Sequence, residues 1–408
     1  MPITAPSVRR PALLATLVAA ALPAAAVAAP AADAAPSPPK SGLRTALQRD
    51  ADGLLRYGTP GVLVGVQRGT RTLKVRSGHG DLRTRRAVPW NAKFRIGSMT
   101  KPFVATVVLQ LVGEGRLSLD DRVERWLPGL VRGHGNDGNA VTVRQLLQHT
   151  SGLPEYTALI PWISTRKGFE AHRFDTVTAR EAVALAMQEK PTFAPGTSWS
   201  YSNTNYALAG LIVEAVTGRP WQDEVRDRIV TPLRLRGTTL PGTDPDIPAP
   251  HAVGYERFPG RGATAEDPRY GRQIDATRQN VSWGGAAGEI ISTVDDGNRF
   301  LRALVGGRLL APAQLAEMQR TVPTNAAFRK NWPGSRYGLG LMRVPTSCGP
   351  SWSHGGDIMG FMTRNGVTPD GRRSVVVTMN TDSPKRRAGV AAPKHDITRR
   401  VIDRALCG

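Results

Sequence analysis

Strand-like segments occur near both ends of this chain, and the long stretch between them has helical character. Strands need partners, so segments from the two ends can form one sheet only if the chain brings its ends together. The sequence therefore predicts an α/β (α+β) fold, in which an antiparallel sheet formed by both chain ends carries flanking helices and an inserted helical lobe. The expected strands are residues 61–67, 73–78, 337–344, 360–367 and 372–380, and a closing helix is expected at 395–406.

The helical middle is indicated by apolar residues at helical spacing. At 408 residues and 40% hydrophobic content, the chain can bury a large core. A cleft between the sheet and the lobe is where a functional site is expected. The expected helices are residues 103–115, 141–153, 178–188 and 205–218.

Residues 1–35 differ in composition from the rest of the chain. Arg9 and Arg10 precede an Ala-rich apolar run that ends in small residues, which is typical of a secretory signal peptide and the start of a linker. A membrane anchor is the alternative, but Pro23 interrupts the run. We expect a Pro/Ala linker at 36–44, one hydrolase domain at 45–408, and a secreted protein with no transmembrane anchor after signal removal.

The chain contains two cysteines, Cys348 and Cys407. In an exported protein an even count favours one disulfide. Two buried thiols are the alternative.

The formal net charge is +21, carried mainly by arginine. Such a charge can attract an anionic cell-wall polymer, or it can simply provide a solvated basic surface. The arginines are scattered, aromatic residues make up only 6%, and no recognition motif occurs. We therefore expect no nucleic-acid partner.

Ser98 and Lys101 stand three residues apart at the start of a long apolar run. On a helix this spacing places both side chains on one face. Burial would lower the pKa of the lysine, so that its neutral amine could take the serine's proton. Ser98 could instead be a helix N-cap. The same spacing occurs twice more, at Ser37/Lys40 and Ser164/Lys167.

Two further motifs favour a catalytic role for Ser98 and Lys101 over a helix cap. Tyr201-Ser202-Asn203 lies at a helix entry in the expected lobe, and His354-Gly355-Gly356 lies among the late strands. In this order the three motifs resemble the penicillin-recognising serine hydrolases (class C β-lactamase-like), and most closely the exported D-alanyl-D-alanine carboxypeptidases of actinomycetes. The resemblance runs from about residue 45 to the C-terminus and includes LLQHTSGLPEY, VSWGGAAGEIISTVDD and the final Cys-Gly, which supports the disulfide.

The resemblance implies catalytic roles for three residues. Ser98 would be the acylated nucleophile and Lys101 its base, while Tyr201 would relay the proton to the leaving group. The N–H groups of Ser98 and Asp357 would form an oxyanion hole.

The resemblance also implies substrate-binding residues. Asn203 would bind the substrate's amide side. His354 would contribute hydrogen bonding or positive charge, and Gly355 and Gly356 would let the strand approach the substrate. Trp283 would form a wall of the cleft, although a core tryptophan is the alternative reading.

One departure from the pattern of the family affects the expected substrate specificity. Relatives that cleave D-Ala-D-Ala often hold the terminal carboxylate with hydroxyl residues after the histidine and an arginine on the neighbouring strand. Here the motif ends in Asp357, and Met342 takes the aligned arginine position. Unless Arg343 or Arg364 compensates, we expect weak activity on free carboxylates relative to amides or esters.

The sequence thus predicts an exported serine hydrolase acting through an acyl-enzyme, D-alanyl-D-alanine carboxypeptidase-like and acting on cell-wall peptides. Its substrate would be a small peptide, ester or β-lactam. Alternatives are an esterase, a β-lactamase or a D-amino-acid peptidase or amidase of the same family, and, from another class, an inactive module that binds cell-wall peptides or β-lactams. We expect no cofactor and no metal, because HExxH and paired Cys motifs are absent.

Overall fold

The computed structural model describes residues 40–264, 269–386 and 389–408. The expected signal peptide at 1–35 and the first residues of the expected linker lie outside the described residues. Residues 40–44, the last part of that linker, belong to helix α1 (Lys40–Leu54).

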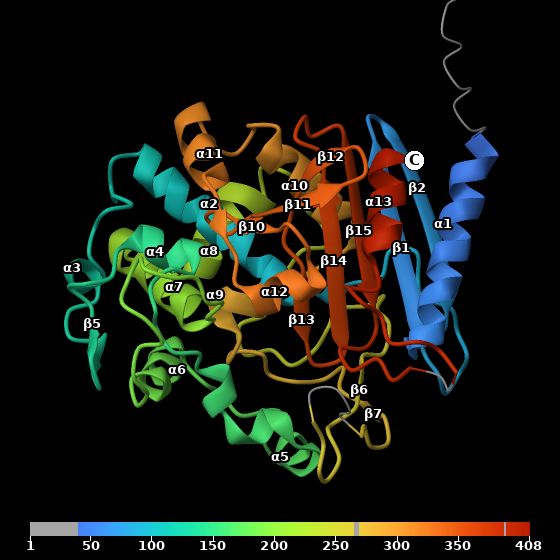
Figure 1. Ribbon diagram of the computed structural model, residues 1–408, viewed down its shortest axis with the longest axis horizontal. Helices are drawn as coiled ribbons and strands as arrows, with labels where there is room; N and C mark the ends of the chain where they lie inside the picture. Colours follow the sequence, from blue (N-terminus) through green and yellow to red (C-terminus); the bar gives the residue numbers. More distant parts are fainter. Residues whose placement is uncertain (1–39, 265–268, 387–388) are drawn as a thin grey trace, which may run out of the picture. The chain divides into compact units, whose positions relative to one another are not determined.

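A nine-stranded sheet carries strands from both ends of the chain, as predicted (Figure 1). Its order is β2-β1-β15-β14-β12-β11-β10-β9, with β13 also paired to β14, and every pairing is antiparallel. The strands are β1 (Gly61–Arg68), β2 (Arg71–Gly78), β9 (Val322–Pro323), β10 (Arg336–Tyr337), β11 (Met342–Thr346), β12 (Gly349–Ser353), β13 (Gly356–Ile358), β14 (Phe361–Val367) and β15 (Arg373–Met379). Three two-stranded ribbons lie apart from it: β3 (Phe94–Arg95) with β8 (Ile291–Ser292), β4 (Arg132–Gly133) with β5 (Asn136–Asp137), and β6 (Tyr255–Glu256) with β7 (Ile274–Asp275).

Most helices lie between β2 and β9 in the sequence. They are α2 (Thr100–Gly113), α3 (Val123–Trp126), α4 (Val143–Gln148), α5 (Arg166–His172), α6 (Ala179–Ala186), α7 (Thr204–Thr217), α8 (Trp221–Val225), α9 (Gly285–Gly288), α10 (Val294–Val305) and α11 (Pro312–Gln319). Most of these form the inserted lobe, whereas α10 packs against β1, β14 and β15 of the sheet. Helices α12 (Ala326–Asn331) and α13 (Arg399–Cys407) follow, and the short helices are η1 (Leu55–Tyr57), η2 (Gly97–Met99), η3 (Thr157–Leu159), η4 (Pro161–Ser164) and η5 (Arg226–Val230).

Both faces of the central strands are covered, which explains why β1 is apolar almost throughout. Val62, Val64 and Val66 face one way, into a cluster with α1 and α13. Leu63 faces the other way, into the main core of the lobe. At Gly65 a Cβ atom would come 2.8 Å from a methyl carbon of Val294 on α10, so glycine lets that helix lie close to the sheet.

Two expected elements end earlier than the sequence indicated. The helix expected at 141–153 starts with a Thr142/Gln145 capping box but stops at Gln148, because His149 has a left-handed φ of 61°. The strand expected at 337–344 is broken between β10 and β11, and Gly340 in the break has a φ of 74°.

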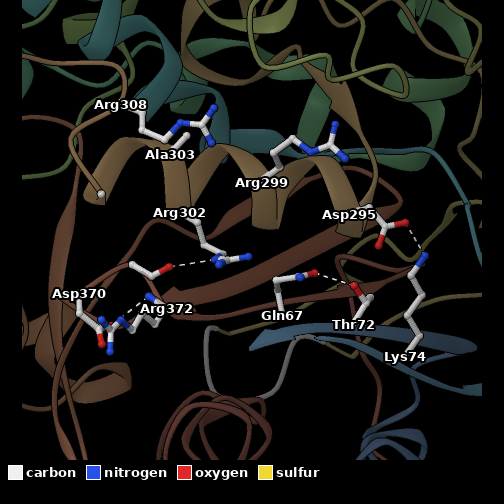
Figure 2. A pocket seen from close by; sticks show the side chains of 12 residues that line it. Gln67, Thr72, Lys74, Asp295, Arg299, Arg302, Ala303, Arg308, Asp370 and Arg372 are labelled. Carbon is white, nitrogen blue, oxygen red and sulfur yellow. Dashed lines mark hydrogen bonds and ion pairs between the residues drawn. The ribbon is translucent and has the colours of Figure 1, made fainter. Parts of the chain in front are cut away.

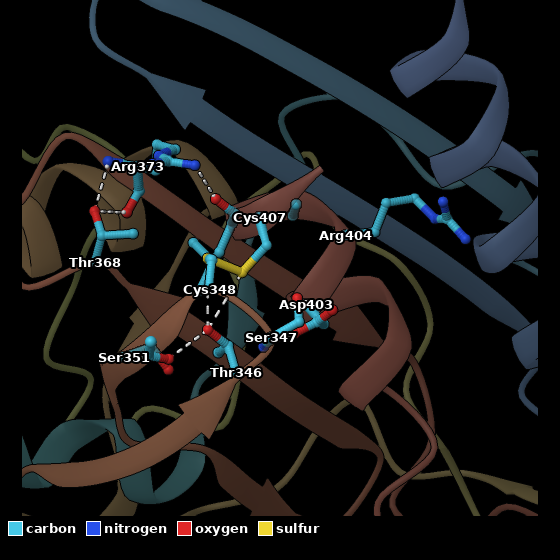
Figure 3. Close-up of a disulfide and its surroundings, with 12 residues drawn as sticks. Thr346, Ser347, Cys348, Ser351, Thr368, Arg373, Asp403, Arg404 and Cys407 are labelled. Atoms are coloured by element: carbon cyan, nitrogen blue, oxygen red, sulfur yellow. Dashed lines mark hydrogen bonds between the residues drawn. A yellow bond between two sulfur atoms is a disulfide. The ribbon is translucent and has the colours of Figure 1, made fainter. Parts of the chain in front are cut away.

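The disulfide expected between Cys348 and Cys407 is present and joins residues 59 apart (Figure 3). It ties the turn between β11 and β12 to the end of α13. Beside it, Ser347 donates two hydrogen bonds to the carboxylate of Asp403, from its backbone N (2.6 Å) and its Oγ (2.8 Å). In the part of the chain that the structure describes, no helix is long and apolar enough to cross a membrane.

Candidate active site

A pocket of about 360 Å³ opens where β13, η2 and the entry of α7 meet. It contains most of the residues that the three motifs singled out. They are Ser98, Tyr201, Asn203, His354, Gly355, Gly356 and Asp357, joined by Phe328, Trp332, Met342, Ser353 and Arg364.

Ser98 and Lys101 lie side by side at the junction of η2 and α2. Lys101 Nζ is 2.9 Å from Ser98 Oγ. Met99 occupies the N-cap position of α2 and makes no side-chain cap bond, so Ser98 does not serve as the cap. The chain places the hydroxyl at the pocket while the lysine is fully buried beneath it.

The amine of Lys101 has three oxygen neighbours. Besides Ser98, it is 2.7 Å from Asn203 Oδ1 and 2.9 Å from the carbonyl oxygen of Ala287. A neutral amine can donate its two hydrogens to these two acceptors, which leaves its lone pair directed at the Ser98 hydroxyl. Burial lowers the pKa of Lys101 to about 7, although Glu155 and Asp357 oppose that shift. The neutral base is therefore well populated near neutral pH.

Tyr201 reaches the same hydroxyl from the start of α7. Burial raises the pKa of Tyr201 well above its usual value, and a hydrogen bond with Ser98 only partly opposes this. Its ring lies with its centre 4.8 Å from Lys101 Nζ. Tyr201 therefore remains a phenol and is placed to pass a proton rather than to act as a phenolate.

Strand β13 lies directly against the turn that carries Ser98. A Cβ atom on Gly356 would come 1.9 Å from the carbonyl oxygen of Ile96 and 2.7 Å from the backbone nitrogen of Ser98. Gly97, on the facing turn, has a φ of 52°, and a Cβ atom there would come 2.8 Å from the backbone nitrogen of Asp357. The absence of a side chain at 356 thus lets β13 approach the nucleophile's own backbone, while the expected approach of this strand to substrate stays a prediction.

His354 belongs to a buried hydrogen-bond chain whose proton positions follow from its ends. Ser202 N can only donate, so His149 Nδ1 (3.3 Å) accepts, and the proton of neutral His149 is on Nε2, 3.2 Å from Tyr337 Oη. At the other end, the carbonyl oxygen of Gly355 can only accept from His354 Nδ1 (2.7 Å). Tyr337 therefore donates to His354 Nε2 across 2.8 Å.

The protonation state of His354 decides between the two contributions expected of it, which are hydrogen bonding and positive charge. Burial, with the charge of Lys101 adding to it, lowers the pKa of His354 to about 3 and that of His149 well below its usual value. His354 consequently contributes no positive charge to the pocket. It acts as a neutral residue that is held by Tyr337 and that anchors the start of β13.

Asp357 and Arg364 face each other across the pocket wall. Arg364 Nη1 is 2.6 Å from Asp357 Oδ1, and Arg364 Nε is 2.7 Å from Asp396 Oδ2. The guanidinium is buried between the two carboxylates, whereas the Asp357 side chain is 50% exposed. Arg364 therefore offsets the charge of Asp357 but is itself shared with a second acid.

Trp283 is not among the residues that line this pocket. It is half-buried and packs against the apolar clusters, as in the core reading of this residue, and its carbonyl oxygen accepts a hydrogen bond from Tyr156.

Sequence reasoning gave no role to several residues that the fold brings to the site. Phe328 and Trp332 come from α12 and its end, and Glu155 Oε2 accepts a hydrogen bond from Asn203 N at 2.5 Å. Glu155 and His149 both lie in LLQHTSGLPEY, which was noted only as part of the resemblance. Among the described residues, no group of three His, Cys, Asp or Glu side chains could hold a metal ion.

Comparison with known proteins points to one hydrolase family. The family model described as Beta-lactamase matches residues 40–398. Penicillin-binding protein 4 of Amycolatopsis lactamdurans is 39% identical over 184 residues, which are 40% of this chain and 44% of that protein. A D-aminopeptidase of Cereibacter sphaeroides is 29% identical over 346 residues, which are 84% of this chain. The chain spans 61% of the length of that D-aminopeptidase.

Among solved structures, a D-stereospecific amidohydrolase from Streptomyces sp. is similar over nearly its whole length. It is 41% identical, with a TM-score of 0.76, and the match covers 85% of this chain and 99% of that one.

Proposed function

Because the chain belongs to the Beta-lactamase family of serine hydrolases, we propose that it is a D-stereospecific amidohydrolase. It would cleave the amide of a D-amino acid, or a short peptide that begins with one, through an acyl-enzyme on Ser98. This is the D-amino-acid peptidase or amidase alternative of the sequence interpretation, preferred to the carboxypeptidase. The similarity to a D-stereospecific amidohydrolase and a D-aminopeptidase supports it.

The charge balance beside the nucleophile is the observation that carries the proposal. Arg364 stands between Asp357 and Asp396, so the three groups together have one negative charge. The exposed member of the trio at the pocket is Asp357. A substrate's free carboxylate would meet this carboxylate, whereas the ammonium group of an amino-acid amide would be attracted to it.

Part of the pocket lining is apolar. Phe328, Trp332 and Met342 form this part, and the ring of Tyr201 is close to parallel with that of Phe328 at a centroid distance of 6.4 Å. An aromatic or large aliphatic substrate side chain would lose apolar surface to water there. We infer that the preferred D-amino acid has such a side chain.

The proposed reaction follows from which groups at the site hold a proton and which can accept one. Neutral Lys101 takes the Ser98 proton as Oγ attacks the amide carbonyl, and the N–H groups of Ser98 and Asp357 receive the developing oxyanion. Tyr201 donates its proton to the leaving nitrogen and is reprotonated from Lys101, so that ammonia or an amine departs. Water then attacks the ester on Ser98. Tyr201 and Lys101 accept the proton of the water and return it to Ser98 Oγ, and the D-amino acid is released.

The test compares kcat/KM for D-phenylalanine amide, L-phenylalanine amide, N-acetyl-D-phenylalanine amide and an N-acyl D-Ala-D-Ala peptide. D-Phenylalanine amide should be the best of the four. Asp357→Asn should lower its kcat/KM roughly tenfold, the effect of one exposed charge pair at contact distance. The N-acetyl amide has no ammonium group, so its kcat/KM should change little.

Variants of two serines provide the controls. Ser98→Ala should lose all activity, and Ser164→Ala, which removes the serine of another Ser-x-x-Lys pair, should keep it. The proposal is wrong if the wild-type protein cleaves the D-Ala-D-Ala peptide better than the D-amide.

We also propose that the protein acts outside the cytoplasm. The apolar run after Arg9 and Arg10 supports this, and so does the disulfide, which persists in oxidising compartments.

A further inference from the structure

A second pocket, of about 630 Å³, lies at the edge of α10 (Figure 2). Its walls come from the β1–β2 hairpin, from α10 and the chain just after it, and from the turn between β14 and β15. The charged residues that line it are Lys74, Asp295, Arg299, Arg302, Arg308, Asp370 and Arg372.

This pocket is separate from the catalytic pocket. The two pockets share no lining residue. On strand β14, Arg364 lines the catalytic pocket and Val367 ends the strand just before the turn that lines the second pocket. The three steps between them, at ~3.3 Å each, span roughly 10 Å. A ligand in the second pocket therefore does not occupy the catalytic one.

Five basic and two acidic residues line this pocket, and both acids already have partners. Asp295 forms an ion pair with Lys74. Asp370 Oδ1 accepts hydrogen bonds from Thr368 Oγ1 (2.5 Å) and from the backbone nitrogen of Arg372 (3.0 Å). No ion pair to a described carboxylate is formed by Arg299, Arg302, Arg308 or Arg372.

The arginines on α10 are oriented by backbone oxygens. Figure 2 shows Arg299 on one side of the α10 ribbon and Arg302 on the other, so their guanidinium groups are spread around the helix. Arg302 Nε donates to the carbonyl oxygen of Gly371 at 2.9 Å, and Arg299 Nη1 donates to that of Arg234 at 2.9 Å. Each guanidinium keeps further N–H groups for a ligand, since it has five donors in all. Figure 2 shows Arg302 pointing into the space between Gln67 and Arg372.

We propose that this pocket binds a polymer that carries repeated phosphate groups. Four guanidinium groups that form no ion pair with a described carboxylate exceed what a single phosphate needs, and the planar fork of arginine matches phosphate oxygens in pairs. The net charge of +21 would attract such a polyanion from a distance. Binding there would hold the enzyme on the polymer while the catalytic pocket stays open.

The test measures binding of short-chain inorganic polyphosphate to the whole protein by titration calorimetry. Polyglutamate of similar charge and inorganic phosphate are the comparison ligands. Polyphosphate should bind more tightly than either, and its affinity should fall steeply with salt, because each contact releases counterions or is screened.

Two variants locate the site. Arg299→Gln/Arg302→Gln/Arg308→Gln should weaken polyphosphate binding roughly tenfold or more by removing three contacts at the pocket. Arg308→Gln/Arg372→Gln keeps the hydrogen bonds from Arg302 to Gly371 and from Arg299 to Arg234, so it tests the pocket even if the triple variant folds poorly.

The matched control is Arg86→Gln/Arg180→Gln/Arg272→Gln, which removes the same charge from exposed positions outside the pocket. Its polyphosphate affinity should fall less than twofold, a change too small for the loss of a direct contact. An equal loss in the control would show that the ligand senses only net charge and would overturn the proposal, as would equal affinity for inorganic phosphate or polyglutamate. Hydrolysis of D-phenylalanine amide should be unchanged in the pocket variants, so this result is independent of the catalytic assignment.

Discussion

Lys101 is the side chain whose protonation limits what the site can do. Its pKa of about 7 means that kcat/KM should fall as pH decreases below 7, approaching tenfold per unit, and should level off above it. His354 should add no second step between pH 5 and 9, because its pKa is about 3 and it stays neutral there. The measurement is a pH profile of kcat/KM for N-acetyl-D-phenylalanine amide, because the free α-amine of D-phenylalanine amide itself titrates at about pH 7.7–8.0.

Lys101→Arg serves as the companion variant to this profile. The guanidinium keeps a positive charge but does not deprotonate, so kcat/KM should drop by roughly 10²-fold or more and lose its pH dependence near neutrality. A variant that retains near-normal activity would mean that another group removes the Ser98 proton.

The contact between strand β13 and helix η2 sets the position of the nucleophile's backbone. In Gly356→Ala the new Cβ atom would overlap the carbonyl oxygen of Ile96, so β13 must move away from Ser98. Because oxyanion stabilisation depends on donors from both elements, we expect a loss of roughly 10²-fold in the rate of Ser98 acylation. Labelling by a fluorophosphonate probe measures that rate directly.

Gly53→Ala is the matched glycine variant for this experiment. Gly53 lies in α1, and a Cβ atom there meets nothing within 4 Å. This variant should label at the wild-type rate and be stabilised slightly, since alanine favours helix. Equal labelling of the two variants would show that the approach of β13 to Ser98 is not needed for acylation.

The disulfide joins two distant parts of the C-terminal region. The chain that it closes contains β12 to β15 and α13, and hence the strand that lines the catalytic pocket. Cys348→Ser/Cys407→Ser should lower the free energy of unfolding by roughly 4 kcal/mol on the chain-entropy estimate for a closed chain of 59 residues. Urea unfolding with and without reductant measures this.

Reduced wild-type protein should unfold at the same urea concentration as the double variant, and reductant should not affect the variant. If the oxidised wild-type protein unfolds no later than the variant, the bond adds no stability in solution.

At the scale of the whole molecule, the family and the layered architecture were predicted from the sequence and are confirmed. Alternation and apolar runs in residues 61–78 and 360–380 identify strands, because a strand has to match its side-chain period to the surface it covers. The order of Ser98, Tyr201 and His354 identified the family, since each motif is local and can be read without the fold.

The tertiary structure alone decided the charges and the contacts of the site. The pKa of Lys101 depends on burial by elements far away in the sequence, and so does the pKa of His354, whose proton position is set by Gly355 and Tyr337. Arg364 could be named from the sequence, but its sharing between Asp357 and Asp396 could not. Solvation and pairing are properties of the space around a group, and residues that are distant in the chain fill that space. The sequence by itself therefore determined the family of hydrolases to which this protein belongs, and only the folded arrangement decided which protonation states its pocket favours and how its charged groups are paired.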